Sequence, residues 1–163
     1  MELKAELSQK NNTISIYDRS YGIIPLIKKA GNDYDIILIK HASGGEWDFP
    51  KGHPEKEDES TIVTAIREFK EELGVDYTLE IRKEKSFEKE FVFTNSMGQI
   101  VHKTVELWIG LIKDTEVPEF KPKLSEISEI RRCNPLEALE LIAFEESKRL
   151  LKEALLFIKN SEL

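Results

Sequence analysis

Residues 52–75 read GHPEKEDESTIVTAIREFKEELGV, and this stretch decides the fold class. Residues 58–60 (Asp-Glu-Ser) supply capping acceptors and negative charge at a helix start, and Gly74 stands where a C-terminal glycine is typical. The stretch therefore predicts a helix over about 60–73 with one side packed inward. Its helical periodicity comes from apolar residues at offsets of 0, 4, 7 and 11: Ile62, Ile66, Phe69 and Leu73.

Three glutamates lie together on the opposite side of this predicted helix. Glu68, Glu71 and Glu72 are at offsets of 0, 3 and 4, which places them on one face. Like charges at this spacing repel each other, and Mg²⁺ is a hard cation that prefers carboxylate oxygens. A solvated acidic helix face is the other explanation of such a pattern. We expect the three carboxylates to face solvent together, either as such a face or as a cation site.

Strands are predicted on both sides of the helix, from stretches rich in β-branched and alternating apolar residues. A long loop with glycines and prolines covers residues 42–59, and helices are predicted from Pro135 and over about 150–158. This order predicts one α/β (α+β) domain over residues 1–163, a mixed sheet sandwiched between helices, with residues 1–12 as a polar, mobile start. The predicted strands cover residues 13–18, 21–29, 34–40, 77–94, 100–113 and 127–133.

Composition narrows the class of protein. With 163 residues, 40% of them hydrophobic, the chain can bury a core, which excludes a disordered protein. The net charge of -7 disfavours stable nucleic-acid binding, and the single cysteine, Cys133, excludes a disulfide framework. No membrane span or secretory signal is recognisable. We therefore expect a cytoplasmic protein with a small-molecule partner and no membrane partner, its oligomeric state open.

The helix and the loop before it closely resemble the Nudix box, whose pattern is G-x5-E-x7-R-E-U-x-E-E-x-G-U with U an aliphatic residue. Phe69 occupies the first aliphatic slot, and one extra residue separates Gly52 from Glu59. Asp58 has the family spacing from Gly52, whereas Glu59 has the family spacing to Arg67, so either acid fits the first-glutamate position. The matching residues are Gly52, Glu59, Arg67, Glu68, Glu71, Glu72, Gly74 and Val75.

The resemblance implies the Nudix fold and hydrolysis of a nucleoside diphosphate linked to another group, with Mg²⁺ or Mn²⁺ as cofactor. By position, Glu68, Glu71 and Glu72 would hold the cations, while Arg67 and Glu59 would brace the loop against the helix. This agrees with the chemistry, because attack on a phosphoryl centre mainly needs charge neutralisation and positioning.

A further glutamate often lies before a late strand in Nudix enzymes, as a cation ligand or general base. Glu126 fits this position best, with Glu129 and Glu119 as competitors. A solvated loop glutamate is the alternative reading of each. A base here would need to reach the attacking water, directly or through one other water.

The flanking segments are similar to those of the asymmetrical diadenosine tetraphosphate hydrolases, in which W-x-x-P-K-G-H precedes the box. Residues 41–53, 87–112 and 141–158 carry this likeness. It implies that lysines contact the polyphosphate and that flat side chains stack on a base, with Arg131 standing where the subfamily has a second aromatic. Solvated lysines and core aromatics are the alternatives. The substrate-binding candidates are Lys51, Gly52, His53, Lys103, Phe93, Trp47 and Arg131.

The leading hypothesis is therefore magnesium-dependent hydrolysis of dinucleoside polyphosphates, giving ATP and AMP from diadenosine tetraphosphate. Removal of pyrophosphate from RNA 5′ ends is the second hypothesis, since such enzymes share the W-x-F-P pattern. They tend to carry glutamine and glycine where this chain has Lys51 and His53. A third hypothesis, a non-catalytic nucleotide-binding Nudix module, is opposed by the intact set of three glutamates.

Overall fold

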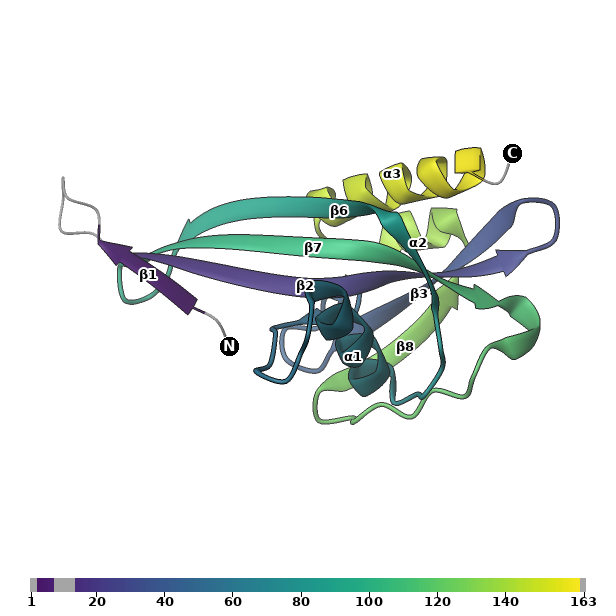
Figure 1. The fold of residues 1–163 in the computed structure, drawn as a ribbon, viewed down its shortest axis with the longest axis horizontal. Coiled ribbons are helices and arrows are strands. Elements are labelled where there is room, and N and C mark those ends of the chain that lie inside the picture. Colours follow the sequence, from purple (N-terminus) through teal and green to yellow (C-terminus); the bar gives the residue numbers. More distant parts are fainter. Residues whose placement is uncertain (1–2, 8–13, 162–163) are drawn as a thin grey trace.

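A computed structural model describes residues 3–7 and 14–161 (Figure 1). Its middle layer is an eight-stranded sheet with the order β4-β3-β2-β7-β6, in which β1 and β5 pair with β2, and β8 pairs with β3. The β2–β7 pair is parallel and the other pairs are antiparallel, which confirms the predicted mixed sheet. The strands are β1 (Leu3–Leu7), β2 (Ile14–Lys29), β3 (Asp33–His41), β4 (Trp47–Asp48), β5 (Lys51–Gly52), β6 (Glu80–Thr94), β7 (Ile100–Lys113) and β8 (Ile127–Cys133).

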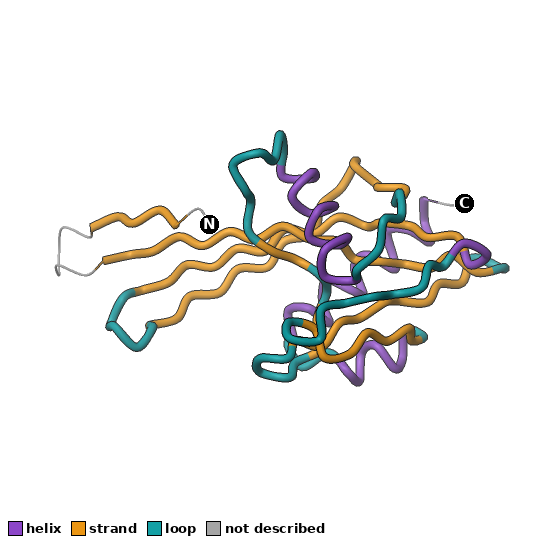
Figure 2. Tube along the Cα trace, turned by 90° about the horizontal axis from the view of Figure 1, so that it is seen from below, coloured by secondary structure: helices purple, strands orange, loops and turns teal. Residues whose placement is uncertain are grey.

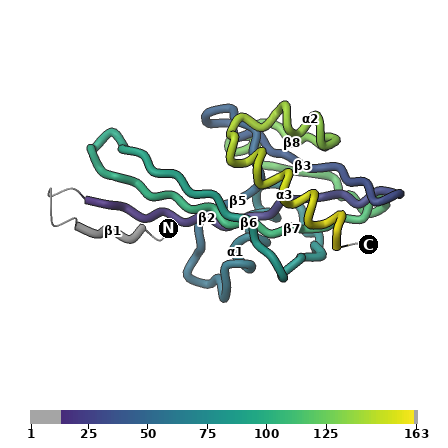
Figure 3. The backbone as a smooth tube through the Cα atoms, turned by 90° about the horizontal axis from the view of Figure 1, so that it is seen from above, coloured from purple at the N-terminus to yellow at the C-terminus, as the bar shows by residue number. Residues whose placement is uncertain are grey.

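Helices cover both faces of the sheet. Helix α1 (Thr61–Leu73) packs on one face, and α2 (Pro135–Leu141) and α3 (Glu145–Ser161) lie on the other (Figure 3). A short 3-10 helix, Asp114–Glu116, follows β7. The prediction of a sheet sandwiched between helices is therefore confirmed. None of the helices in the described ranges is both long and apolar enough to cross a membrane.

The two cores follow from the alternation of side chains along the central strands. In β2, Ile24 and Leu26 belong to the core under α2 and α3, whereas Ile23 and Ile27 belong to the core under α1. Successive side chains of a strand point to opposite faces, so a strand covered on both sides reads as an unbroken apolar run. This explains why IIPLI stands at the centre of the sheet. Cys133 is buried in the first of these cores, as predicted.

Helix α1 begins and ends where the sequence predicted. The Ser60 side chain accepts a hydrogen bond from the Val63 N–H at 3.2 Å. Gly74 ends the helix with φ of 64°, in the left-handed region that glycine enters without steric cost. Phe69 and Leu73 are fully buried beneath it. The cap, the buried stripe and the terminal glycine thus fix which helix face carries the glutamates.

The structure differs from the prediction at three places. Strand β2 runs unbroken through the point where two strands were predicted, and the short strands β4 and β5 lie inside the predicted loop. Residues 3–7 form β1, whereas the rest of the predicted mobile start lies outside the described residues. The strands β1, β2, β6 and β7 together extend well beyond the helices, as an arm on one side of the molecule (Figure 2).

Candidate active site

Asp58 braces the loop before α1 against the helix. Its carboxylate accepts hydrogen bonds from Arg67 Nε at 3.1 Å and from Arg67 Nη2 at 3.0 Å. It also accepts from Thr64 Oγ1 at 2.9 Å and from the Glu55 N–H at 2.8 Å. These donors, led by the Arg67 guanidinium, hold the pKa of Asp58 far below its ordinary value. The loop is therefore locked to the helix through one ionised carboxylate.

The bracing role predicted for Glu59 belongs to Asp58. Glu59 is exposed and forms no hydrogen bond or ion pair with the described part of the chain. The extra residue of the box therefore falls after the functional acid, between Asp58 and the cap Ser60, and not between Gly52 and that acid. The correction has a simple cause: spacing from Gly52 and spacing to Arg67 disagree by one residue, and only the loop geometry decides between them.

Arg67 also holds two of the three predicted metal ligands. Its Nη1 donates to Glu68 Oε1 at 3.0 Å and to Glu71 Oε2 at 3.1 Å, while its Nη2 donates to the His53 carbonyl at 2.9 Å. Glu71 is exposed, with 56% of its side-chain surface accessible. The repulsion expected among the carboxylates is thus offset within the protein by a guanidinium placed between them.

Glu72 does not face solvent, which corrects the expectation for the third glutamate. Its residue surface is only 9% exposed, and its Oε1 accepts a hydrogen bond from the Lys51 N–H at 2.7 Å. Burial raises the pKa of Glu72 to about 8, and the nearby negative charges of Glu68 and Glu126 act in the same direction. A carboxylate in this condition gains more than an exposed one from a cation beside it.

Gly52 permits the close approach of the loop to the helix. A Cβ atom at this position would collide with the Glu68 carboxylate, so only glycine fits without displacing that group. Burial raises the pKa of Glu68 as well, against the opposing effect of Arg67. Glu68 and Glu72 therefore both lie in the seam between α1 and the residues that follow β4.

The donor chemistry fits a divalent metal, although the structure does not gather three ligands around one point. Within the described ranges, no group of three Asp, Glu, His or Cys side chains is arranged to hold a metal ion. Glu68 and Glu71 instead bind Arg67. Hard carboxylate oxygens and a buried acid of raised pKa are nonetheless what Mg²⁺ or Mn²⁺ would bind and stabilise.

Glu126 lies on the loop before β8, and its carbonyl accepts a hydrogen bond from the Ala42 N–H at 2.9 Å. Its side chain is exposed, and its charge raises the pKa of Glu72. Glu129, the first competitor, is paired with Arg131 at 2.9 Å. The structure thus places Glu126 within electrostatic reach of Glu72. Its role as a ligand or base stays a prediction.

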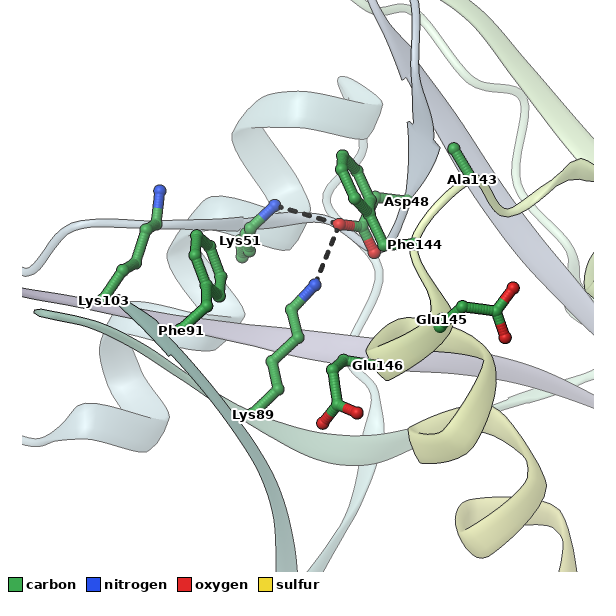
Figure 4. A pocket seen from close by; sticks show the side chains of 9 residues that line it. All are labelled: Asp48, Lys51, Lys89, Phe91, Lys103, Ala143, Phe144, Glu145 and Glu146. Atoms are coloured by element: carbon green, nitrogen blue, oxygen red, sulfur yellow. Dashed lines mark hydrogen bonds and ion pairs between the residues drawn. The ribbon is translucent and has the colours of Figure 1, made fainter. Parts of the chain in front are cut away.

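A cavity of about 510 Å³ lies where β4, β5, β6 and β7 meet the start of α3 (Figure 4). Lys51 links it to the carboxylates, because its N–H contacts Glu72 while its side chain lines the cavity. The lining combines three ammonium groups and two aromatic rings with three carboxylates, those of Asp48, Glu145 and Glu146, so the lysines and the rings are the groups that could contact a phosphate chain and a flat group. The residues concerned are Lys51, Lys89, Lys103, Phe91 and Phe144.

Asp18 on β2 holds two of the predicted substrate residues at the side of this region. Its Oδ1 lies 2.6 Å from His53 Nε2, and its Oδ2 lies 3.8 Å from Lys103 Nζ. The structure therefore brings Lys51, Gly52, His53 and Lys103 into one neighbourhood. Of these, Lys51 and Lys103 line the cavity.

The other three predicted substrate residues lie elsewhere. Trp47 is buried in the core, and the Arg131 guanidinium lies 5.0 Å from its ring centroid. Phe93 stacks on Phe91 with a centroid distance of 6.1 Å but does not line the cavity. The Arg131 guanidinium thus lies over the Trp47 ring, and the cavity presents Phe91 in place of Phe93.

Sequence reasoning missed most of the residues around the cavity, among them Asp48, Lys89, Phe144 and Ser147. One signal was available, because the alternation of β6 puts Lys89 on the same side as Phe87, which is buried. A lysine at an inward-facing strand position needs a buried partner. That partner is Asp48 on the short strand β4, which is distant in sequence and has no local signature.

The comparisons with known proteins give the class of this protein, a hydrolase that acts on phosphorus-containing anhydrides. The NUDIX domain profile matches residues 17–154, and the chain belongs to the Nudix family. It is similar to the asymmetrical bis(5'-nucleosyl)-tetraphosphatase of Sus scrofa, with 35% identity over 136 residues, covering 82% of this chain and 87% of that one.

Two further comparisons extend this result. The mRNA-decapping protein g5R of African swine fever virus (isolate Warthog/Namibia/Wart80/1980) is 35% identical over 138 residues, which cover 77% of this chain but 54% of that protein. The crystal structure of a C. elegans Ap4A hydrolase binary complex superposes with a TM-score of 0.74 at 21% identity, covering 88% of this chain and 98% of that chain. The structural likeness confirms the Nudix fold.

Proposed function

We propose that the protein hydrolyses dinucleoside polyphosphates and cleaves diadenosine tetraphosphate into ATP and AMP. One observation carries the proposal. The Lys51 N–H donates a hydrogen bond to the buried Glu72, while the Lys51 side chain lines a cavity that also contains lysines and phenylalanines. The Sus scrofa relative, named as an asymmetrical tetraphosphatase, supports the same substrate class. In a substrate with several phosphates and terminal bases, the phosphates would contact the lysines of the cavity and a base would contact its aromatic rings.

In this proposal the cavity binds the part of the substrate that is not cleaved. Lys51 and Lys103 contact the phosphate chain as point charges. Phe91 and Phe144, which line the cavity and are partly exposed, stack on a base. With its phosphates bound by lysines and a base bound by aromatic rings, the substrate would be held so that one particular phosphate lies next to α1.

The cofactor in this proposal is Mg²⁺ or Mn²⁺, held by Glu68, Glu71 and Glu72 with Glu126 as a further candidate. When bound, the cation supplies charge neutralisation on the phosphates and lowers the pKa of water. Arg67 keeps Glu68 and Glu71 in place, and the Lys51 N–H orients the Glu72 carboxylate. Glu126, exposed and near Glu72, is suited to accept the proton of the attacking water.

The test is turnover of diadenosine tetraphosphate with Mg²⁺, with the products resolved by chromatography. Equal amounts of ATP and AMP are expected, whereas ADP alone would contradict asymmetrical cleavage. Nucleotide binding with no product in either Mg²⁺ or Mn²⁺ would favour a non-catalytic module and overturn the proposal.

The base-stacking role has a matched pair of variants. Phe144→Ala should raise KM about 5- to 150-fold, since stacking on an aromatic side chain contributes about 1–3 kcal/mol per base. Phe93→Ala is the control, because Phe93 is similarly exposed (45% against 47%) and does not line the cavity. A larger effect for Phe93→Ala than for Phe144→Ala would indicate that the base stacks on Phe93, the other member of the Phe91–Phe93 pair on β6.

A second candidate function is removal of the cap, or of pyrophosphate, from the 5′ end of RNA. The similarity to the viral mRNA-decapping protein favours it. This chain spans about half of that relative's length, and its net charge of -7 provides no long basic track. Capped RNA and triphosphorylated RNA belong in the same substrate panel. Faster turnover of either RNA than of diadenosine tetraphosphate would make this the function.

A further inference from the structure

Asp48 forms the centre of a buried ionic cluster at the base of the cavity (Figure 4). Its Oδ2 lies 3.3 Å from Lys89 Nζ and 3.4 Å from Lys51 Nζ, and its Oδ1 accepts a hydrogen bond from the Phe49 N–H at 2.9 Å. The side chains of Asp48 and Lys89 are each 5% exposed, whereas that of Lys51 is 17% exposed. One carboxylate is therefore shared by two lysines, of which Lys51 is the more accessible.

Lys89 is fixed from three directions. Its Nζ donates to Ser147 Oγ at 2.5 Å, contacts Asp48, and lies 5.4 Å from the centroid of the Phe144 ring. Ser147 is fully buried in α3, so the cluster joins β6, the residues after β3 and the C-terminal helix. A lysine held in this way cannot swing toward a substrate as a flexible surface lysine would.

The charges of the cluster decide what it can do. One carboxylate and two ammonium groups leave a net charge of +1. Because Lys89 is the more buried partner, Lys51 is the group that can turn its charge toward the cavity. Were Asp48 paired with Lys51 alone, the pair would be neutral and would offer a phosphate little attraction.

We propose that Lys89 is a positioning residue that shares the Asp48 carboxylate and so leaves Lys51 available to bind the substrate polyphosphate. The proposal rests on the proposed function for the identity of the substrate. Lys89 also lines the cavity, but its effect on Lys51 passes through Asp48. The buried acid thus anchors Lys51 without neutralising it.

The test is a charge-balance cycle. Lys89→Met leaves Asp48 and Lys51 as a neutral pair, and should raise KM for diadenosine tetraphosphate about 10-fold or more with kcat changed less than about twofold. The double variant Asp48→Asn with Lys89→Met removes both opposite charges and restores the net charge of +1. It should bring KM back to within about threefold of wild type.

Three control variants separate this role from a structural one. Lys89→Arg should rescue KM, because it keeps the charge. Ser147→Ala removes one hydrogen bond to Lys89 without changing the charge of the cluster, and should change KM less than about threefold. Lys83→Met removes an exposed lysine from the same strand and should leave KM unchanged, which controls for the overall charge.

The outcomes are distinct. A double variant no better than Lys89→Met, or an equal loss in kcat, would overturn the proposal. If Lys89→Met does not fold by circular dichroism, Asp48→Asn alone decides, since freeing Lys51 should not raise KM. If wild type does not cleave the nucleotide, the proposed function fails separately. The same variants are then compared for the Kd of inorganic tripolyphosphate, where the same order is expected and its absence refutes the positioning role.

Discussion

Replacing Glu72 by glutamine should stabilise the metal-free protein while it destroys turnover. The pKa of Glu72 in the folded protein is about 8, against an ordinary value of 4.5, because the carboxyl group is buried. The amide of glutamine can keep the acceptor for the Lys51 N–H, now at 2.7 Å, and removes only the negative charge. The substitution therefore isolates the cost of that charge.

The sign and size of the effect follow from linkage. Between pH 4.5 and about 8 the folded protein holds a proton that the unfolded chain has released, so stability falls as pH rises through this window. At about 1.36 kcal/mol per pKa unit, the loss is complete above pH 8 and amounts to at most about 5 kcal/mol. Glutamine mimics the protonated acid, so Glu72→Gln should gain this amount at pH 9 and nothing near pH 4.5.

The assay is guanidinium denaturation in EDTA at pH 5, 7 and 9, with Glu71→Gln as the matched control. Glu71 is exposed, so Glu71→Gln should not show a stability gain over wild type that grows with pH. Turnover of Glu72→Gln in Mg²⁺ should fall roughly 100-fold or more, as for the loss of a strong charge interaction at a reacting centre. A stability difference that does not change between pH 5 and pH 9 would refute the reasoning.

Three other outcomes are expected. Gly52→Ala should reduce turnover, because its Cβ would displace the Glu68 carboxylate. It should lower the free energy of unfolding by only about 1 kcal/mol, the low end for overpacking, since that carboxylate ends a flexible side chain; turnover equal to that of wild type would contradict this placement of Glu68. Asp58→Asn should lower the free energy of unfolding by roughly 1.5–3 kcal/mol, because the hydrogen bonds to Arg67 are weakened. Glu59→Gln should change it by less than about 0.5 kcal/mol. Thermal melts that rank these two variants in the opposite order would restore Glu59 as the bracing acid. Adding Mg²⁺ to EDTA-treated protein should raise Tm with increasing concentration, because a ligand that binds only the folded state stabilises it; calorimetry showing no change up to millimolar concentration would argue against a site.

Features that depend on neighbours in sequence were predictable. The cap at Ser60, the glycine at the end of α1 and the buried positions Phe69 and Leu73 of its apolar stripe are local and were placed correctly, whereas Ile66 of the same stripe belongs to neither core. The unbroken apolar run of β2 likewise shows that helices cover the sheet on both faces. Local pattern fails where a difference of one residue in spacing decides, as between Asp58 and Glu59. The path of the loop, and not the number of residues in it, determines which of these acids binds Arg67.

Features that depend on distant segments were not predictable. The cluster of Asp48, Lys89 and Ser147 joins residues 41 and 58 positions apart, and no spacing rule connects them. The burial of Glu72 has a similar origin, since the segment carrying Lys51 covers a helix face that looks exposed when the helix is considered alone. Phe91 and Phe93 share one side of β6, and only the position of α3 determines which of them lines the cavity.

The parallel pairing of β2 with β7 sets the order in which the chain can fold. Ser15 pairs with Ile100 and Lys28 with Lys113, so every partner lies 85 positions later in the chain. At a synthesis rate of roughly 5–20 residues per second, the central strand waits on the order of 4–17 s for its neighbour. During that interval the nascent chain exposes to solvent four side chains that are fully buried in the folded protein: Ile23, Ile24, Leu26 and Ile27. Assembly of this sheet is therefore non-local and slow, and its nascent form is the one most prone to aggregate.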